Sequence, residues 1–204
     1  MSITSLKNQL NTKKINKHNL NKNANNLLIE YGLYIKKMFP NVRIHLLNND
    51  LYIVTKKDSL HNLAYFLKYH TNSQFKSLID LGVIDYPQKK NRFELNYFFL
   101  SVQYNTRITV VTYTQDSFPV RSLTDIFKSS NWMEREAWDM FGVFFAKHND
   151  LRRILTDYGF KGHPLRKDFP LSGYIEVIYN FFDKKIESKE LSLTQAYRNF
   201  NLDR

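Results

Sequence analysis

Cysteine is absent from this chain. Without thiols the chain cannot form a disulfide, supply a thiolate to zinc, use a cysteine nucleophile or hold a cysteine-ligated iron–sulfur cluster. Glycine is scarce as well, with six residues dispersed among 204. Neither GxGxxG nor GxxxxGK[ST] occurs, so the glycine-rich loops that cradle phosphates are missing. GxSxG and HExxH are missing too, which excludes the nucleophile elbow of hydrolases and the helical zinc motif.

Long apolar runs are also missing. The most apolar stretch, Leu95–Val102, contains Asn96 and Ser101, whereas a membrane-spanning helix needs about 18 uncharged apolar residues. The remaining composition is typical of globular proteins, with 43% hydrophobic, 24% charged and 15% aromatic residues in 24.4 kDa. A chain of this length buries roughly 70% of its unfolded surface, so we expect a substantial core.

Acidic residues are rare near the N-terminus, and the net charge of +11 is concentrated there. Residues 1–50 hold eight basic side chains against only Glu30 and Asp50. Three interpretations of the segment before Glu30 stay open: a mitochondrial import presequence, a disordered tail, or the codon bias of an A/T-rich organellar genome. The basic charge also keeps nucleic-acid binding open as an alternative function, because it favours contacts to phosphates.

Apolar spacing and turn residues divide the chain into predicted elements. We predict helices over 19–39, from Asp58 or Ser59 to about 71, briefly from Ser122, and over about 131–141 ending at Gly142, with strands over 42–47, 51–55, 75–86, 93–102 and 108–114. The strands form two hairpins, and helices interleave with them without strict strand–helix–strand alternation. This favours an α+β fold, a mixed or antiparallel sheet with helices packed on it. We expect a basic N-terminal arm over 1–18, an α+β domain over 19–145 and a long irregular C-terminal docking arm over 146–204.

The densest polar cluster spans residues 132–142. On a helix, Arg135 and Asp139 are four residues apart and can pair, while Glu136 and Asp139 are three apart and can act as a general acid and base. A carboxylate pair flanked by arginine and tryptophan more often anchors an interface or a buried ion network. We favour that interpretation over a carboxylate hydrolase.

A second cluster spans residues 148–173, where arginines alternate with large apolar residues in a chain articulated by glycine and proline. Aromatic rings fill pockets, guanidinium groups grip carboxylates, and prolines limit the entropy lost on ordering, so this composition favours docking to a partner protein. The interleaved Asp150, Asp157 and Asp168 disfavour a polyanionic ligand. His148 with Asp150 is the only close pairing of metal-ligand types, and a solvated loop or an interface hydrogen bond is its better interpretation.

Both clusters resemble a known family. The runs from Glu134 to Gly142 and from Leu151 to Gly173 closely resemble the signature of NADH dehydrogenase subunit 9 of respiratory complex I, also called the 30-kDa subunit, in its mitochondrial type. The resemblance covers roughly residues 60–200 and includes Leu78-Ile79-Asp80, Asp85-Tyr86-Pro87, Arg92-Phe93-Glu94, Tyr104-Asn105, Arg107-Ile108 and Leu193-Thr194-Gln195. Asn149 departs from the pattern, since the family commonly has proline there.

The resemblance implies a core subunit in the peripheral arm of proton-pumping NADH:ubiquinone oxidoreductase, inactive by itself. It implies that this chain binds no cofactor, while the whole complex uses FMN, iron–sulfur clusters, NADH and ubiquinone. The implied partners are other complex I subunits, chiefly the quinone-site subunit 7, of 49 kDa in the family's naming, and the terminal iron–sulfur-cluster subunit, with no nucleic acid. The implied location is peripheral, on the matrix side of the mitochondrial inner membrane, with membrane association only through the complex.

Within this family the two clusters supply the predicted site residues, and we expect none that is catalytic, cofactor-binding or metal-binding. The predicted interface with other subunits comprises Glu134, Arg135, Glu136, Trp138, Asp139, Arg152, Arg153, Tyr158, Arg166, Lys167, Asp168 and Phe169. Two alternatives from other classes stay open. One is an organellar RNA-binding or ribosome-associated protein, and the other is a hydrolase that acts through Glu136 and Asp139.

Overall fold

A computed structural model describes residues 27–47, 50–195, 197–198 and 200. The predicted N-terminal arm over 1–18 and the start of the first predicted helix, over 19–26, lie outside these residues. Among the helices that are described, none combines the length and the hydrophobicity required to cross a membrane.

A central sheet of five strands runs in the order β1-β2-β5-β4-β3. The strands are β1 (Arg43–Leu47), β2 (Asp50–Thr55), β3 (Ser77–Asp85), β4 (Phe93–Ser101) and β5 (Thr106–Thr114). Neighbouring strands are antiparallel except β2 and β5, which pair in parallel. The sheet is therefore mixed, and the predicted hairpins β1–β2 and β4–β5 are confirmed.

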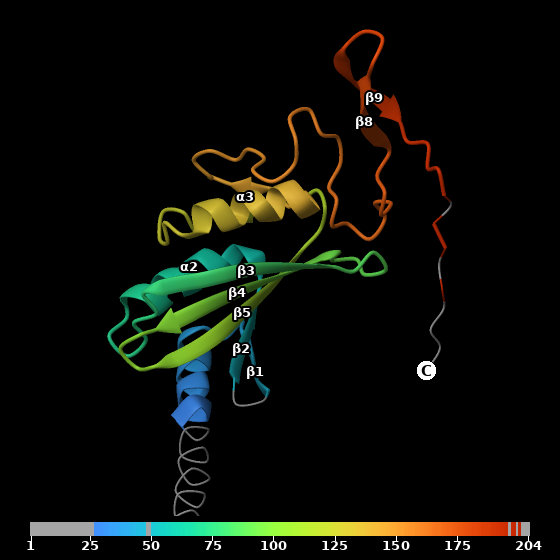
Figure 1. The fold of residues 1–204 in the computed structure, drawn as a ribbon. Coiled ribbons are helices and arrows are strands. Elements are labelled where there is room, and N and C mark those ends of the chain that lie inside the picture. Colours follow the sequence, from blue (N-terminus) through green and yellow to red (C-terminus); the bar gives the residue numbers. More distant parts are fainter. Residues whose placement is uncertain (1–26, 48–49, 196, 199, 201–204) are drawn as a thin grey trace, which may run out of the picture.

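In the described part of the chain, three helices accompany the sheet: residues 27–38, α2 (Lys57–Tyr69) and α3 (Ser130–Phe141). Figure 1 shows α2 and α3 on the same side of the sheet. The prediction that Asp58 or Ser59 caps α2 is wrong, because the N-cap is Lys56, which makes no side-chain cap hydrogen bond. The helix follows β2 almost directly. Asp58 therefore falls in the first turn, where its charge favours the positive end of the helix dipole.

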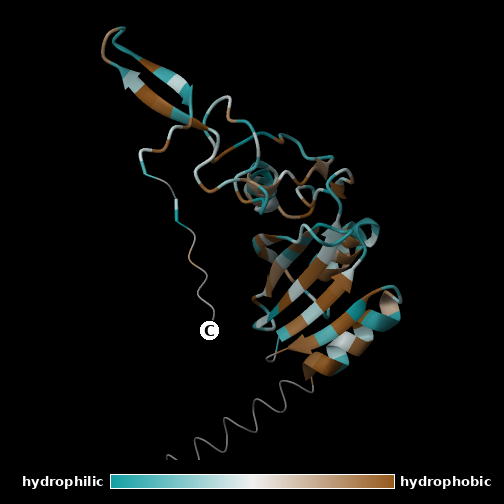
Figure 2. Ribbon diagram, turned by 90° about the vertical axis from the view of Figure 1, so that its right-hand side faces the viewer, coloured by the Kyte–Doolittle hydropathy of each residue, from teal (hydrophilic) through white to brown (hydrophobic). Residues whose placement is uncertain are grey.

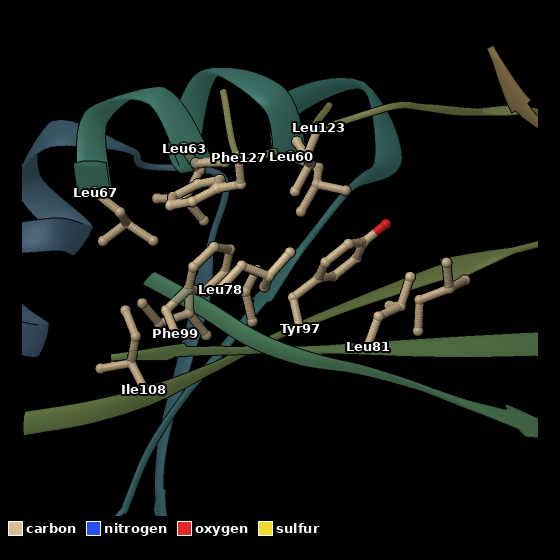
Figure 3. Packing of buried hydrophobic residues seen from close by; sticks show 14 of the residues in the cluster. Leu60, Leu63, Leu67, Leu78, Leu81, Tyr97, Phe99, Ile108, Leu123 and Phe127 are labelled. Atoms are coloured by element: carbon tan, nitrogen blue, oxygen red, sulfur yellow. The ribbon is translucent and has the colours of Figure 1, made fainter. Parts of the chain in front are cut away.

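The hydrophobic core lies between α2 and the sheet. Leu60, Leu63 and Leu67 recur on one face of α2 and point toward Tyr97 and Phe99 of β4, as Figure 3 shows. The strand residues alternate between the core and the opposite face, as the period of two requires. Each fully buried leucine contributes about 2 kcal/mol of transfer free energy, so this layer anchors the whole domain.

The short helix predicted from Ser122 is wrong, because residues 122–129 form turns between β6 (Val120–Arg121) and α3. The Ser122 hydroxyl accepts the Thr124 N–H at 3.1 Å, and the Glu134 carboxylate accepts the Leu123 N–H at 2.8 Å. Side-chain acceptors thus take backbone donors and compete with helix formation. β6 pairs in parallel with β7 (Phe145–Ala146), which follows α3.

The C-terminal part is not irregular throughout, contrary to the expectation from the sequence. Residues 147–173 have no helix or strand, but β8 (Ile175–Asn180) and β9 (Lys185–Glu190) form an antiparallel hairpin. The prediction missed this hairpin because its second strand, β9, has Ile186 as its only apolar residue among charged and polar ones, unlike the longer apolar runs of the central strands.

Candidate functional site

Residues 147–173 lie along α3, as the orange segment in Figure 1 shows. We use the name α3 cluster for α3, residues 147–173 and the polar side chains of the sheet that contact them. Two acidic residues organise it. Asp139 of α3 and Asp85 at the end of β3 are both buried.

Asp139 is fully buried and accepts five hydrogen bonds from one loop. The donors are the N–H groups of Ile154 at 3.2 Å, Leu155 at 2.8 Å and Thr156 at 3.0 Å, the Thr156 hydroxyl at 2.7 Å and the Arg153 guanidinium at 3.0 Å. Burial acts to raise the pKa of Asp139, but the hydrogen bonds outweigh it and lower this pKa to about 2. Asp139 is therefore an ionised anchor for the loop.

The predicted pairing of Arg135 with Asp139 is wrong. The buried Arg135 guanidinium instead donates to the carbonyl oxygens of Arg152 at 3.1 Å and Arg153 at 3.3 Å. These carbonyl groups lie in a segment without helix or strand, and Arg135 supplies a hydrogen-bond donor to each. The Arg153 guanidinium in turn lies over the Trp138 ring, 5.4 Å from its centre. Both arginines thus hold the loop to α3.

Asp85 ties the same loop to the sheet. Its carboxylate accepts two hydrogen bonds from Arg92, at 2.7 and 2.8 Å, and the N–H of Lys167 at 2.9 Å. Arg92 also donates to Asp168 at 2.9 Å. The hydrogen bonds from Arg92 lower the pKa of Asp85 and of Asp168. Arg92 therefore bridges two carboxylates from distant parts of the chain.

The loop also completes the C-terminal end of α3. The last carbonyl groups of a helix lack partners within it. Here three of them accept hydrogen bonds from the loop, in the pairs His163 with Asp139, Leu165 with Met140 and Arg166 with Phe141. The guanidinium of Arg166 additionally makes two hydrogen bonds to Asp116, at 2.6 and 3.0 Å.

The remaining acidic residues of α3 lie in different surroundings. Glu134 is fully buried and accepts hydrogen bonds from Ser122, Ser130 and the Leu123 N–H, and burial raises its pKa. Glu136 is exposed. Cavities of about 550 and 460 Å³ in the described part of the chain are lined by neither Glu136 nor Asp139.

These positions argue against the hydrolase alternative. The acceptor oxygens of Asp139 are occupied by the loop, so the proposed acid and base do not face a common cleft. The ring nitrogens of His148 make hydrogen bonds within the chain, one with the carbonyl oxygen of Asn131 at 3.2 Å and one with the N–H of Asp150 at 3.1 Å. The interface hydrogen bond considered from sequence stays a prediction. Among the residues that the structure covers, no group of three metal-ligand side chains occurs.

The twelve predicted interface residues divide by exposure. Glu134, Arg135 and Asp139 are buried; Trp138, Arg153, Arg166 and Phe169 are half-buried; Glu136, Arg152, Tyr158, Lys167 and Asp168 are exposed. The buried ones have all their observed contacts within this chain. Contact with another subunit stays a prediction for all twelve.

Sequence reasoning did not assign Asp85, Arg92 and Asp116, which contact the α3 cluster from elsewhere in the chain. It also did not single out Thr156 and His163, which lie within residues 147–173. Asp85 and Arg92 lie in stretches that carry the family resemblance, and this resemblance was the one sequence feature that could have marked them as functional residues. The contact between Asp85 and Lys167 was not predictable, because 82 residues separate the two in the sequence.

A family model described as respiratory-chain NADH dehydrogenase, 30 Kd subunit, matches residues 53–175. Over 179 residues the chain is 50% identical to NADH-ubiquinone oxidoreductase subunit 9 of Reclinomonas americana, an alignment that covers 87% of this chain and 88% of the relative. This chain belongs to the 30-kDa subunit family. The match includes α3 and all of residues 147–173, so the α3 cluster is part of the 30-kDa subunit fold.

Other comparisons agree with this assignment. NADH dehydrogenase (ubiquinone) iron-sulfur protein 3 of Marchantia polymorpha is 56% identical over 149 residues, 73% of this chain and 76% of the relative. A solved trypsin-resistant fragment of Nqo5 aligns with a TM-score of 0.52 at 24% identity, covering 61% of this chain and 99% of the fragment. A chain of the membrane-bound sulfane sulfur reductase, an archaeal respiratory membrane complex, aligns with a TM-score of 0.61 at 24% identity over 70% of this chain and 85% of that one. These two structures support the fold.

Proposed function

We propose that this member of the 30-kDa subunit family is a non-catalytic core subunit of the peripheral arm of proton-pumping NADH:ubiquinone oxidoreductase. It supports assembly of the complex and holds the quinone-site subunit in place. Electrons pass from NADH to ubiquinone through FMN and iron–sulfur clusters on other subunits. The 50% identity to a named subunit of this enzyme over 87% of the chain carries the proposal.

The α3 cluster is consistent with a supporting role. Its buried charges are used for internal hydrogen bonds that hold residues 147–173 in one conformation. The same loop presents Tyr158, which is fully exposed at 104% of its reference area, and it also contains the exposed Arg152 and Lys167. A preformed surface with an exposed aromatic ring and basic groups binds a partner at low entropic cost.

The partners in this proposal are the 49-kDa quinone-site subunit and the subunit that carries the terminal iron–sulfur cluster. The location is the matrix side of the mitochondrial inner membrane, reached through the complex. A relative in Candida albicans is named as a mitochondrial subunit of NADH dehydrogenase, and this name supports the mitochondrial part of the proposed location. Family membership favours this function over RNA binding, which none of the relatives named above supports.

Native separation of detergent-extracted mitochondrial membranes tests the proposal. We expect the chain to migrate with a large assembly that oxidises NADH and contains the 49-kDa subunit. A chain found only as a monomer would contradict the proposal. Retention of the isolated chain on RNA, lost steeply as salt rises, would favour the RNA-binding alternative instead.

A variant of the exposed anchor gives a second test. We expect Tyr158→Ala to reduce the amount of assembled complex several-fold, because truncating a central aromatic anchor costs about 2 kcal/mol of binding free energy. Turnover of the complex that remains should be normal. The matched control is Tyr65→Ala on α2, where the tyrosine is 57% exposed. Normal assembly with collapsed turnover would indicate a direct chemical role.

A further inference from the structure

The hairpin β8–β9 stands clear of the sheet in both views of the chain (Figures 1 and 2). Ile175, Val177 and Tyr179 alternate along β8, and Tyr179 lies opposite Ile186 of β9. Alternate residues of a strand point to the same face, and directly opposed residues share that face. These four side chains, exposed by 50% to 72%, therefore form one apolar face.

The other face of the hairpin is mainly polar: Ile178 is its apolar residue, and most of the remaining side chains pair with one another. Glu176 lies opposite Lys189, and Asn180 lies opposite Lys185. Glu187 accepts a hydrogen bond from Asn180 at 3.3 Å and pairs with Lys185 at 3.1 Å. Oppositely charged side chains that pair in this way are stable when exposed to solvent. The hairpin is thus amphipathic, and its apolar face is the one exposed unfavourably to water.

The turn extends the apolar face. Phe181 is 81% exposed and meets Tyr179 edge to face, with ring centres 5.1 Å apart. Phe182 is 97% exposed, and its N–H donates to the side chain of Asn180 at 3.0 Å. The two phenylalanines are therefore presented by an ordered turn.

We infer that this apolar face docks on an apolar surface of another subunit of the complex, one that also carries a basic or hydrogen-bonding group facing Glu190, an inference that rests on the proposed function. A two-stranded hairpin is marginally stable in water and gains stability when a further layer covers its apolar face. The family model ends at Ile175, the first residue of β8, so the rest of this face lies beyond that family model.

Charge distinguishes a protein partner from a membrane. Residues 174–190 contain three lysines and four acidic residues, Glu176, Asp183, Glu187 and Glu190. A segment with this negative balance gains nothing from anionic lipid headgroups. Glu190 also lies opposite Ile175, on the same face, and would be drawn into lipid with it.

Size distinguishes a subunit of the complex from a second copy of this chain. The six residue pairs of the hairpin span about 20 Å along the strands and about 10 Å across them, roughly 200 Å² on each side. A stable dimer interface needs about 800 Å² from each partner. The face is therefore sufficient only as one part of a larger contact, made by a subunit that also binds elsewhere on this chain.

The test uses full-length variants in the organism. Val177→Thr combined with Ile186→Thr removes apolar surface and keeps β-branched residues, so the strands are retained. We expect the amount of chain in the assembled complex to fall roughly tenfold, in line with the apolar surface lost. The matched control is Ile178→Thr on the opposite face, which should assemble within about twofold of the wild type.

Each outcome decides between the proposals. Wild-type chain absent from the complex would reject the proposed function itself. Wild-type chain present, with the double variant equally present, would reject only the docking face, as would an equal loss in Ile178→Thr. Flotation of the wild-type chain with phosphatidylserine vesicles, abolished in the double variant, would reassign the face to a membrane. Sedimentation as a dimer that the double variant disrupts would reassign it to a second copy.

Discussion

Two buried carboxylates on one helix, Glu134 and Asp139, have pKa values shifted in opposite directions. Both lose hydration, which favours the neutral acid. Asp139 has five donors, one of them a guanidinium, and they outweigh burial. Glu134 has three uncharged donors, and burial prevails. The number and charge of the donors therefore decide in which direction each pKa moves.

We predict that Asp139→Asn lowers the free energy of unfolding by about 3 kcal/mol, because an amide nitrogen would face donors and leave Arg153 without its counter-charge. Glu134→Gln should cost about 1 kcal/mol or less, since the hydroxyls of Ser122 and Ser130 can rotate to accept from the amide. Urea unfolding at pH 7 measures both changes. Glu136→Gln, at an exposed position of the same helix, is the control. Equal costs for the two buried positions would contradict this account.

At the scale of elements, the end of α3 depends on a glycine and on the loop beyond it. Gly142 has φ +78°, and a Cβ there would lie 2.7 Å from the ring of His163 and in contact with Arg166. Gly159 has a similar φ of +73°, but a Cβ there would meet nothing within 4 Å. The two glycines share one backbone conformation and differ only in their surroundings.

We therefore expect Gly142→Ala to destabilise the chain more than Gly159→Ala. The second change carries only the strain of a left-handed alanine, about 1 kcal/mol. The first also displaces His163 and Arg166, which complete the helix end, and should cost about 2 kcal/mol more. Thermal unfolding of the two variants measures the difference. Identical shifts in Tm would show that the loop does not support α3.

At the scale of the whole molecule, aspartates hold distant segments together. Asp139 joins α3 to the following loop, and Asp85 joins the sheet to Lys167 and, through Arg92, to Asp168. The pKa of each of these aspartates is lowered. Their ionised forms therefore stabilise the fold above the ordinary pKa, and this contribution disappears as the pH falls through the lowered values.

We expect the free energy of unfolding to fall as the pH decreases from about 4 to about 2. Asp139 alone, with its pKa lowered from 3.8 to about 2, accounts for about 2 kcal/mol of the loss. Urea midpoints measured across this range should therefore fall less steeply in Asp139→Asn than in the wild type. Parallel slopes in the two proteins would show that Asp139 is not ionised through these contacts.

Local patterns in the sequence determined the two hairpins of the sheet, α2, α3 with its end at Gly142, and the resemblance that the family match confirms. These features depend on apolar periods and turn residues within about ten positions, which a sequence displays directly. The residues of α3 and its loop that form much of the cluster were also identified in this way.

Only the tertiary structure decided which groups these residues bind. Arg135 donates to backbone carbonyls instead of Asp139, residues 122–129 form turns because Glu134 takes the Leu123 N–H, and Asp85 reaches Lys167 across 82 residues. A buried polar group pairs with whichever donor or acceptor the fold brings within about 3 Å, and that neighbour is set by packing of the whole chain. Sequence spacing therefore predicted the elements, while long-range packing selected their partners.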